Sequence, residues 1–338
     1  MIKYGVVVPE YYGDDRLFNI NDTISNRDNN LYHWYLLKNK FIEHGVDLTT
    51  YDHSRDKEYS KIIFPDIPNS SQFNIKSKSN RERDLYLVLF ESELIKPNNW
   101  DTENHKYFSK IFTWNDTIVD GEKYIKYCWP NKIPPDTHYD IKKKDRLCTM
   151  IVAHKQNKHP LELYSERIKA IRWFEGNHPK EFDLYGMGWD KYNFTGEISY
   201  LNRYDIIRKL FKPKYPSYKG TVISKMEELR KYKFSFCYEN ARDIPGYITE
   251  KIFDSFFAGC VPIYLGAPNI GDYIPENTFI DKREFNNYKD LFNYIATMGE
   301  NEYEEYVSNI KEYLNSDSAL LFSAERFTEN ILYHMLPR

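Results

Sequence analysis

The stretch YKFSFCYENARDIPGYITEKIFDSFFAGCVPIYLG, residues 232–266, decides the fold. Residues 233–239 form an apolar run that predicts a buried strand, and residues 261–265 predict a second one. Between them a Pro-Gly turn precedes residues 249–257, where the pattern predicts a helix. A strand, a helix and a second strand in this order form a βαβ unit, whose two strands run parallel.

Short β-branched runs alternate with longer amphipathic stretches along the rest of the chain as well. Further strands are expected at residues 3–8, 47–51, 61–64, 85–90, 110–114, 147–154 and 182–186. Further helices are expected from about residue 30 to Gly45, at 161–175, 224–232, 288–298, 302–314 and 327–336, with a long loop at 187–219. The strands are apolar on both faces, as in parallel sheets covered by helices on either side. We therefore expect an α/β protein.

The length of 338 residues suits two domains of roughly 150 residues each. Residues 132–146 have a Pro-Pro pair, no apolar periodicity and several basic residues, which is typical of a linker. The expected domains are therefore 1–140 and 146–320, with a C-terminal helix at 321–338 that packs across them. We expect the basic run at 142–144 to be solvated and not to bind phosphate, because runs of charge usually are solvated. Two such halves leave a cleft, and open α/β sheets bind ligands beyond the carboxyl ends of their strands.

The composition excludes several classes of protein. Apolar residues make up 41% of the chain and charged residues 29%, which is enough for packed cores under a polar surface. The net charge of −3 argues against a dedicated nucleic-acid binder. No stretch approaches the roughly 18 apolar residues of a transmembrane segment, and the N-terminus fits a strand better than a signal peptide. The four cysteines lie far apart without CxxC spacing, so we expect buried reduced thiols in a cytoplasmic protein.

Polar residues gather around the helix predicted at residues 249–257. Glu239 and Asn240 stand at the carboxyl end of the preceding strand, and Thr249, Glu250 and Lys251 open the helix. A helix N-terminus offers free N–H groups and a partial positive charge suited to a phosphate, and Lys251 adds a full charge. Glu250 can accept hydrogen bonds from two neighbouring hydroxyls, such as those of a ribose.

The ring of Tyr247, just before this helix, can pack against a base or a sugar. Each of these residues also has an ordinary interpretation, in which Glu250 and Lys251 merely occupy a first helical turn and Tyr247 belongs to the core. Taken singly, each residue favours the ordinary interpretation. Their gathering within fifty residues favours a binding site.

Three segments of this region, FSFCYEN (234–240), GYITEKIFDSFFAGCVPIYLG (246–266) and YIPENTFID (273–281), resemble the signature of glycosyltransferase family 10, the fucosyltransferases. Weaker similarity through LYSERIKAIRWF, DLYGMGW and LFESELIKPNNW extends the resemblance over about residues 84–285. The resemblance implies two Rossmann-like domains that face an interdomain cleft, the arrangement called GT-B. It also implies GDP-L-fucose as the donor substrate, inversion at the sugar carbon, and no metal or other cofactor.

The same resemblance implies roles for individual residues. Glu250 is expected to bind the ribose of GDP, and Lys251 and Asn240 its diphosphate and surroundings. Tyr247 is expected to line the donor pocket, and the remaining donor-binding candidates of this segment are Glu239 and Thr249.

The family also has an arginine early in the first helix of the second domain. Arg167 is the closest match, and Arg172 lies one turn further along; an ordinary surface ion pair is the alternative for both. A guanidinium suits a pyrophosphate because its fork donates two hydrogen bonds at once. Lys219 and Lys225 are further candidates, expected to close over the phosphates.

Inverting transfer needs a base that takes the proton from the acceptor hydroxyl, on the face opposite the leaving GDP. Glu91, at the end of the strand predicted at 85–90 and in a segment that resembles the FES segment of the family, is the expected base. If the strand continues, Glu93 lies on the same face and is the reserve candidate.

Two departures from the family pattern leave details open. The family has proline where this chain has Glu93, which puts the acceptor geometry in doubt, and Ser-Asn where it has Ala153-His154, which puts donor contacts in doubt. His154 could contact a phosphate or act as a second acid or base, but a polar loop residue is the more common explanation.

The expected activity is therefore transfer of L-fucose to a hydroxyl of a glycan acceptor, in α-1,3 or α-1,4 linkage to a sugar of the N-acetylglucosamine type, as in protein glycosylation. Since no N-terminal anchor is evident, a bacterial or viral type of enzyme is expected. One alternative is transfer from another nucleotide-activated deoxysugar, and a second is a noncatalytic glycan-binding protein with the same fold. The acceptor and the oligomeric state stay open.

Overall fold

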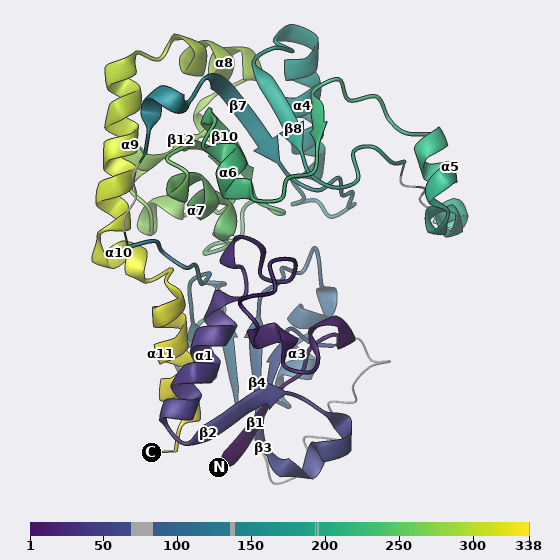
Figure 1. Cartoon of the computed structure of the whole chain (residues 1–338), viewed down its shortest axis with the longest axis vertical. Coiled ribbons are helices and arrows are strands. Elements are labelled where there is room, and N and C mark those ends of the chain that lie inside the picture. The colour runs from purple at the N-terminus through teal and green to yellow at the C-terminus, as the bar shows by residue number, and fades with distance from the viewer. Residues whose placement is uncertain (69–83, 136–138, 193, 195, 338) are drawn as a thin grey trace.

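The structure is a computed structural model of the whole chain, and it describes residues 1–68, 84–135, 139–192, 194 and 196–337. Two lobes stand one above the other, each built on a parallel sheet with helices beside it (Figure 1). The predicted α/β class and the two Rossmann-like sheets are confirmed.

The first sheet has the strand order β2-β1-β3-β4-β5-β6, and all of its strand pairs are parallel. Its strands are β1 (Ile2–Val6), β2 (Val46–Thr50), β3 (Tyr59–Pro65), β4 (Asp84–Leu89), β5 (Lys110–Thr113) and β6 (Tyr124–Lys126). Helix α1 (Tyr32–Glu43) packs beside β2, and the short helix α3 (Thr102–His105) precedes β5. The expected strands of the first half are all present, and β6 was not predicted because only its middle residue is buried.

The second sheet has the order β12-β11-β10-β7-β8-β9, again with parallel pairs. Its strands are β7 (Arg146–Ile151), β8 (Phe182–Tyr185), β9 (Tyr218–Gly220), β10 (Tyr232–Tyr238), β11 (Val261–Leu265) and β12 (Ile280–Asp281). The strand order reverses between β7 and β10, which makes the ends of these two strands the topological switch point of the sheet. Strands β9 and β12 were not predicted, because each has only two or three residues.

Helices of the second lobe surround this sheet. They are α4 (Tyr164–Asn177), α5 (Asp205–Leu210), α6 (Lys225–Leu229), α7 (Glu250–Phe257), α8 (Tyr288–Thr297) and α9 (Glu300–Leu314). Helix α7 packs on β10 and β11, as the βαβ pattern predicted. The region expected as a loop at 187–219 contains α5 and a 3-10 segment, Gly196–Arg203, and extends away from the lobe (Figure 1).

The C-terminal segment returns to the first lobe. After α10 (Asp317–Leu320), helix α11 (Ala324–Met335) lies against α1, where the Phe327 ring contacts Trp34. The Tyr4 hydroxyl donates to the carbonyl of Met335 at 3.2 Å. Helix α9, by contrast, is part of the core of the second lobe. The chain therefore crosses between the lobes twice. None of the helices in the described residues is long and apolar enough to cross a membrane.

The basic run at residues 142–144 contradicts the expectation of a wholly solvated linker. The side chain of Lys144 is buried, and its ammonium donates to the carbonyls of Tyr232 and Ala258 at 3.1 and 3.0 Å and to that of Arg230 at 3.3 Å. Lys144 thus satisfies the carbonyl groups left over where β10 begins and α7 ends. The neighbouring Lys142 and Lys143 are exposed, as expected. All four cysteines are buried and free, as predicted.

The two lobes touch at the turn that precedes α7. The Asp116 N–H donates to the carbonyl of Pro245 at 3.2 Å, and the ring of Trp114 lies 4.5 Å from that of Tyr247. Gly246 has a φ of +79°, and a Cβ there would collide with the carbonyl oxygen of Trp114. Glycine at this position therefore allows the carboxyl end of β5 to meet the second lobe closely.

Candidate active site

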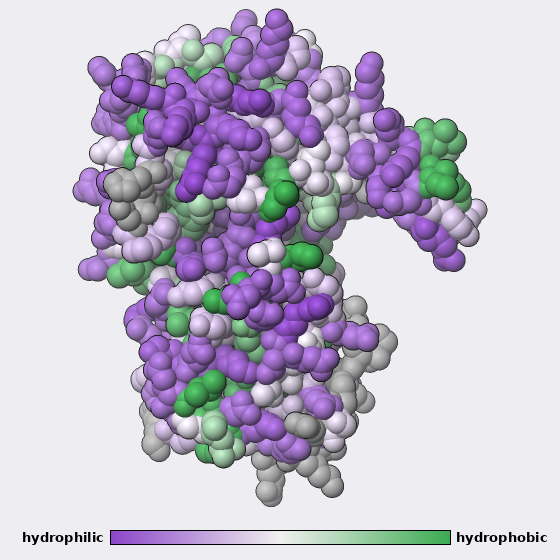
Figure 2. Space-filling view, in the orientation of Figure 1, coloured by the Kyte–Doolittle hydropathy of each residue, from purple (hydrophilic) through white to green (hydrophobic). Residues whose placement is uncertain are grey.

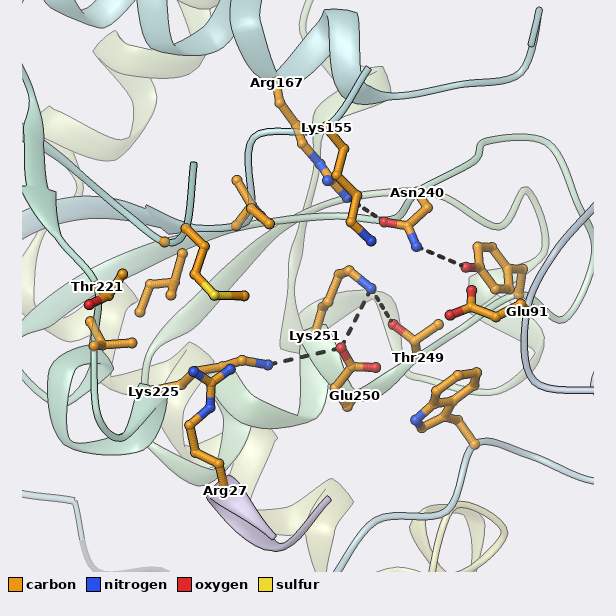
Figure 3. Close-up of a pocket in the computed structure, with 18 residues that line it drawn as sticks. Arg27, Glu91, Lys155, Arg167, Thr221, Lys225, Asn240, Thr249, Glu250 and Lys251 are labelled. Atoms are coloured by element: carbon orange, nitrogen blue, oxygen red, sulfur yellow. Dashed lines mark hydrogen bonds and ion pairs between the residues drawn. The ribbon is translucent and has the colours of Figure 1, made fainter. Parts of the chain in front are cut away.

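A cleft of about 340 Å³ lies beyond the carboxyl ends of β7 and β10, at the switch point of the second sheet. Its walls come from both lobes, because Arg27, Glu91 and Trp129 of the first lobe line it together with residues of the second. Five lining residues are Lys or Arg and two are Glu, so the lining carries a net positive charge. The charged ones are Arg27, Glu91, Lys155, Arg167, Lys225, Glu250 and Lys251 (Figure 3). This charge and position suit a phosphorylated ligand.

Glu239 holds the N-terminus of α7 in place through hydrogen bonds and an ion pair. Its carboxylate has no exposed surface and accepts hydrogen bonds from the backbone N–H and the hydroxyl of Thr249, at 2.8 Å each. The Lys251 ammonium lies 3.0 Å from the same carboxylate and donates to the Thr249 hydroxyl at 2.9 Å. Glu239 itself does not line the cleft. It holds Thr249 and Lys251, which do line it.

The environment of Lys251 favours its charged form. Burial by itself would lower the pKa of its ammonium, but the carboxylates of Glu239 and Glu250 outweigh burial and raise that pKa. Glu250 responds in the opposite sense, because burial would raise its pKa, whereas Lys251 and Lys225 hold it at about 2. The first turn of α7 therefore presents a cation beside a carboxylate, and Thr249, the N-cap residue, makes no side-chain capping bond. This arrangement can bind an anion and a pair of hydroxyls side by side.

Arg167 is placed on α4 as its match in the sequence suggested. It is buried, and its Nη2 donates to the carbonyls of Tyr238 and Glu239 at 2.7 and 2.8 Å and to Oδ1 of Asn240 at 3.1 Å. Its Nε is buried without a partner among the described residues. The guanidinium is thus fixed to the end of β10 with part of its donor capacity unused, and it reaches the cleft wall.

Asn240 and Tyr247 join this wall. The Asn240 amide donates to the Tyr247 hydroxyl at 3.4 Å. Tyr247 is buried and its ring contacts Trp114, so the interpretation of Tyr247 as a core residue holds for its ring. Tyr247 is also among the residues that line the cleft.

Glu91 brings a carboxylate from the first lobe to the edge of the same cleft (Figure 3). Its backbone is clamped, since its N–H donates to Asp66 at 3.1 Å and its carbonyl accepts from the indole of Trp100 at 3.1 Å. Its carboxylate accepts no hydrogen bond from the described residues. Burial and the charge of Asp66 raise the pKa of Glu91, although Lys155 and Lys251 oppose them. A raised pKa and an unengaged carboxylate suit a general base.

Glu93 lies apart from this edge. The strand does not continue through both acids, because β4 ends at Leu89 and the chain turns after Ser92, with the N–H of Ile95 donating to the Ser92 carbonyl at 3.0 Å. Glu93 is exposed and is not among the residues that line the cleft.

Of the other basic candidates, one lines the cleft and two do not. Lys225 lines the cleft, 2.7 Å from Asp254 and 3.9 Å from Glu250. Lys219, on β9, instead forms an ion pair with Asp183 at 3.2 Å and does not line the cleft. Arg172, one helical turn beyond Arg167, pairs with Glu175 on the surface at 2.7 Å.

His154 is also outside the cleft lining. Its ring stacks on Trp189 at 4.5 Å, and burial lowers its pKa. The interpretation as a structural loop residue fits this position.

Among the lining residues that sequence did not predict, three are charged or carry a hydroxyl group: Arg27, Lys155 and Thr221. Lys155 is exposed and has no hydrogen-bond or ion-pair partner among the described residues. It follows directly after Ala153-His154, at the end of β7, so a search for polar residues beyond every strand end would have found it. Arg27, in the 3-10 segment Arg27–Asn29, and Thr221, in a loop, have no sequence pattern that indicates a site, and only the fold brings them to the cleft.

Comparison with known families gives one match over more than half of the chain. Residues 141–325 match the family described as "Glycosyltransferase family 10 (fucosyltransferase) C-term". The match spans the whole second sheet and the residues of α7.

Curated relatives match over shorter stretches. An alpha-(1,3)-fucosyltransferase of Helicobacter pylori is 38% identical over 74 residues, which is 22% of this chain and 15% of the relative. An alpha-(1,4)-fucosyltransferase of Arabidopsis thaliana is 38% identical over 77 residues, 22% and 19% of the two chains. A GDP-fucose protein O-fucosyltransferase 3 of Gallus gallus is 40% identical over 82 residues, 23% and 17%. The aligned stretches thus span less than a fifth of these relatives.

Solved structures share the whole architecture. A crystal structure of an alpha1,3-fucosyltransferase matches with a TM-score of 0.55 at 14% identity, over 98% of this chain and 88% of that one. An alpha-glucosyltransferase in complex with UDP-glucose and DNA matches with a TM-score of 0.58 at 11% identity, over 98% of both chains. At such identities the likeness shows the two-lobed GT-B fold alone.

Proposed function

Because the chain belongs to glycosyltransferase family 10, the fucosyltransferases, we propose that it transfers L-fucose from GDP-L-fucose to a hydroxyl group of a glycan acceptor. The observation that carries this proposal is the pairing of a cationic cleft at the β7 and β10 ends with a carboxylate from the other lobe. A nucleotide-sugar transferase needs these two features facing each other, and a glycan-binding protein needs neither.

In the proposed complex the diphosphate lies against Lys251, Arg167 and the N-terminus of α7. Glu250 accepts hydrogen bonds from the ribose hydroxyls, for which its pKa of about 2 keeps it ionised. Lys225 and Lys155 extend the positive charge toward the cleft mouth. These side chains supply the positive charge that stabilises the leaving GDP, so we propose that a divalent metal is not required.

The chemical step is a single displacement at C1 of fucose. The acceptor oxygen forms a bond to C1 as the bond from C1 to the β-phosphate oxygen breaks, and GDP leaves with that electron pair. Glu91 takes the proton of the acceptor hydroxyl. Attack from the face opposite GDP inverts the configuration at C1, and we propose an α-1,3 linkage to a sugar of the N-acetylglucosamine type.

The donor class is tested by thermal denaturation with GDP, UDP, CMP and their sugars. Selective stabilisation by GDP and GDP-fucose is expected, because a ligand that binds only the folded state raises its melting temperature. Stabilisation by UDP or CMP and their sugars instead would contradict the donor assignment. Release of GDP from GDP-fucose in the presence of an acceptor glycan, measured with and without EDTA, then tests transfer and the role of metal. Nucleotide binding without release under any acceptor would favour the noncatalytic alternative.

A further inference from the structure

Tyr192, Phe194 and residues 196–214 form an extension of the second lobe that we call the projecting arm. It stands clear of both lobes (Figure 1). The arm has its own internal bonds: the Tyr192 N–H donates to the Arg208 carbonyl at 2.9 Å, and the Arg208 Nε donates back to the Tyr192 carbonyl at 3.0 Å. Phe194 and Asn202 exchange a second pair of bonds at 2.9 and 2.8 Å. These bonds give the arm a folded structure of its own.

The surface of the arm is apolar at its tip, where Figure 2 shows green side chains. Ile206 is 84% exposed, Leu210 78% and Phe211 57%. Four more large apolar side chains of the arm are exposed: Tyr192, Ile198, Tyr200 and Tyr204. Ile206 and Leu210 are four residues apart on α5 and so share one face of the helix. Isolated exposed apolar side chains are ordinary. Six of them within fourteen residues indicate a surface that binds a partner or a membrane.

The arm is also cationic, although the whole chain carries a net charge of −3. Residues 196–214 contain five Lys or Arg and two acids. One acid, Asp205, is paired with Lys191 at 2.7 Å. Lys209 and Lys212 flank the apolar tip and are exposed, and their ammonium groups have no hydrogen-bond or ion-pair partner among the described residues. The partner of this surface must therefore accept apolar side chains and positive charge at the same place.

We propose that the projecting arm docks on the surface of an anionic lipid bilayer. Ile206, Leu210 and Phe211 enter the boundary between headgroups and acyl chains, and Lys209 and Lys212 contact lipid phosphates. Short amphipathic segments with basic residues beside aliphatic and aromatic ones bind such surfaces, and tyrosine rings such as those of the arm favour the headgroup level. Because the arm stands clear of the lobes, its tip reaches a flat surface without obstruction by the rest of the molecule.

A second copy of this chain fits the surface of the projecting arm less well than a lipid bilayer does. In a symmetric dimer through the arm, the same patch would face itself, and the basic residues of the two arms would repel one another. The donor cleft is not an alternative use either, because the arm residues named here do not line it.

Co-sedimentation of the full chain with vesicles tests the proposal. Binding is expected to vesicles of phosphatidylcholine mixed with phosphatidylglycerol, and to weaken with added salt and with pure phosphatidylcholine. The double variant Ile206→Ser/Leu210→Ser is expected to reduce binding by about tenfold. Its matched control is Ile24→Ser, since Ile24 is 82% exposed on the other lobe.

A second pair of variants tests the contribution of positive charge to vesicle binding. Lys209→Glu/Lys212→Glu is expected to abolish the preference for anionic vesicles, whereas Lys180→Glu, an exposed lysine of the second lobe, is expected to leave it unchanged. Binding that is equal for wild type and both arm variants, or no binding to anionic vesicles, overturns the proposal. A dimer measured by light scattering that the Ile206→Ser/Leu210→Ser variant dissolves overturns it as well, in favour of a second copy.

Discussion

The ammonium of Lys251 lies 3.0 Å from the fully buried carboxylate of Glu239, across the first turn of α7. Glu239 thereby fixes the direction of Lys251 and, through Thr249, the start of the helix. The positive end of α7 and the lysine charge point into the cleft because a carboxylate that never meets solvent holds them there. This contact links the core of the second lobe to the binding of the donor.

Glu239→Gln removes the buried negative charge and keeps one oxygen for the Thr249 N–H. Lys251 then loses its main partner, so the free energy of unfolding should fall by about 3 kcal/mol, as when one member of a buried ion pair is removed. GDP affinity should fall as well. Urea denaturation and nucleotide titration measure the two effects. Glu305→Gln, on the exposed face of α9, is the control, and an equal effect of both variants would show that Glu239 has no special role.

Glu91→Gln should reduce turnover by about a hundredfold or more, because a missing general base costs on that order. Binding of GDP should be unchanged, since Glu91 reaches the cleft from the opposite lobe. Initial rates of GDP release, with thermal shifts by GDP as the binding measure, separate the two. Glu93→Gln is the matched control, because Glu93 is exposed and outside the cleft lining. Loss of turnover in Glu93→Gln alone would indicate that Glu93, and not Glu91, is the base.

The pH dependence follows from the surroundings of Glu91, which acts as a base only when ionised. Burial, Asp66 and Glu250 raise its pKa, and Lys155 and Lys251 lower it, with a net increase. Turnover should therefore decline with falling pH at a higher pH than an ordinary glutamate would produce. A profile of kcat/KM against pH measures this acid limb.

Asp66 is a positioning residue for Glu91. Its carboxylate accepts from the N–H groups of Phe90 and Glu91 at 2.7 and 3.1 Å and from the amide of Asn99 at 2.6 Å. Asp66→Asn keeps an oxygen for the backbone but removes the charge, so the acid limb of the profile should move to lower pH. An unmoved limb in a folded variant would contradict the electrostatic role of Asp66.

Arg167→Lys should weaken GDP binding by about tenfold, because an ammonium cannot hold the end of β10 and also reach a diphosphate as a forked guanidinium can. Isothermal titration with GDP measures the loss. Arg172→Lys on the same helix is the control, since Arg172 pairs on the surface and should change GDP binding little. Equal losses in both variants would mean that Arg167 acts only through the stability of α4.

Lys144→Met should lower the free energy of unfolding by about 1–3 kcal/mol, because it leaves buried carbonyls without donors. The carbonyls of Tyr232 and Ala258 lose a donor at about 3 Å. Lys142→Met changes an exposed lysine two residues earlier and should shift the urea midpoint little. Equal midpoints for the two variants would contradict the structural role given to Lys144.

The pattern of residues 232–266 was sufficient for the fold class because buried parallel strands are apolar on both faces and each is followed by a helix. The order of the strands is not in that pattern. The order depends on which strands pair through backbone hydrogen bonds. The backbone groups that form these bonds are the same in every residue, so the sequence pattern does not show which strands will pair. The strands with few buried residues, β6, β9 and β12, carry too little apolar signal to be recognised.

Among the site residues, those that follow β10 and open α7 could be predicted, because consecutive residues at a strand end and a helix start lie together whatever the rest of the chain does. Tertiary structure alone decided that Lys144 is buried, that Lys219 pairs with Asp183, and that β4 stops before Glu91. It also brought Arg27 to the cleft. Local sequence sets what a segment can form, but the position of a side chain relative to distant segments depends on how the two lobes pack.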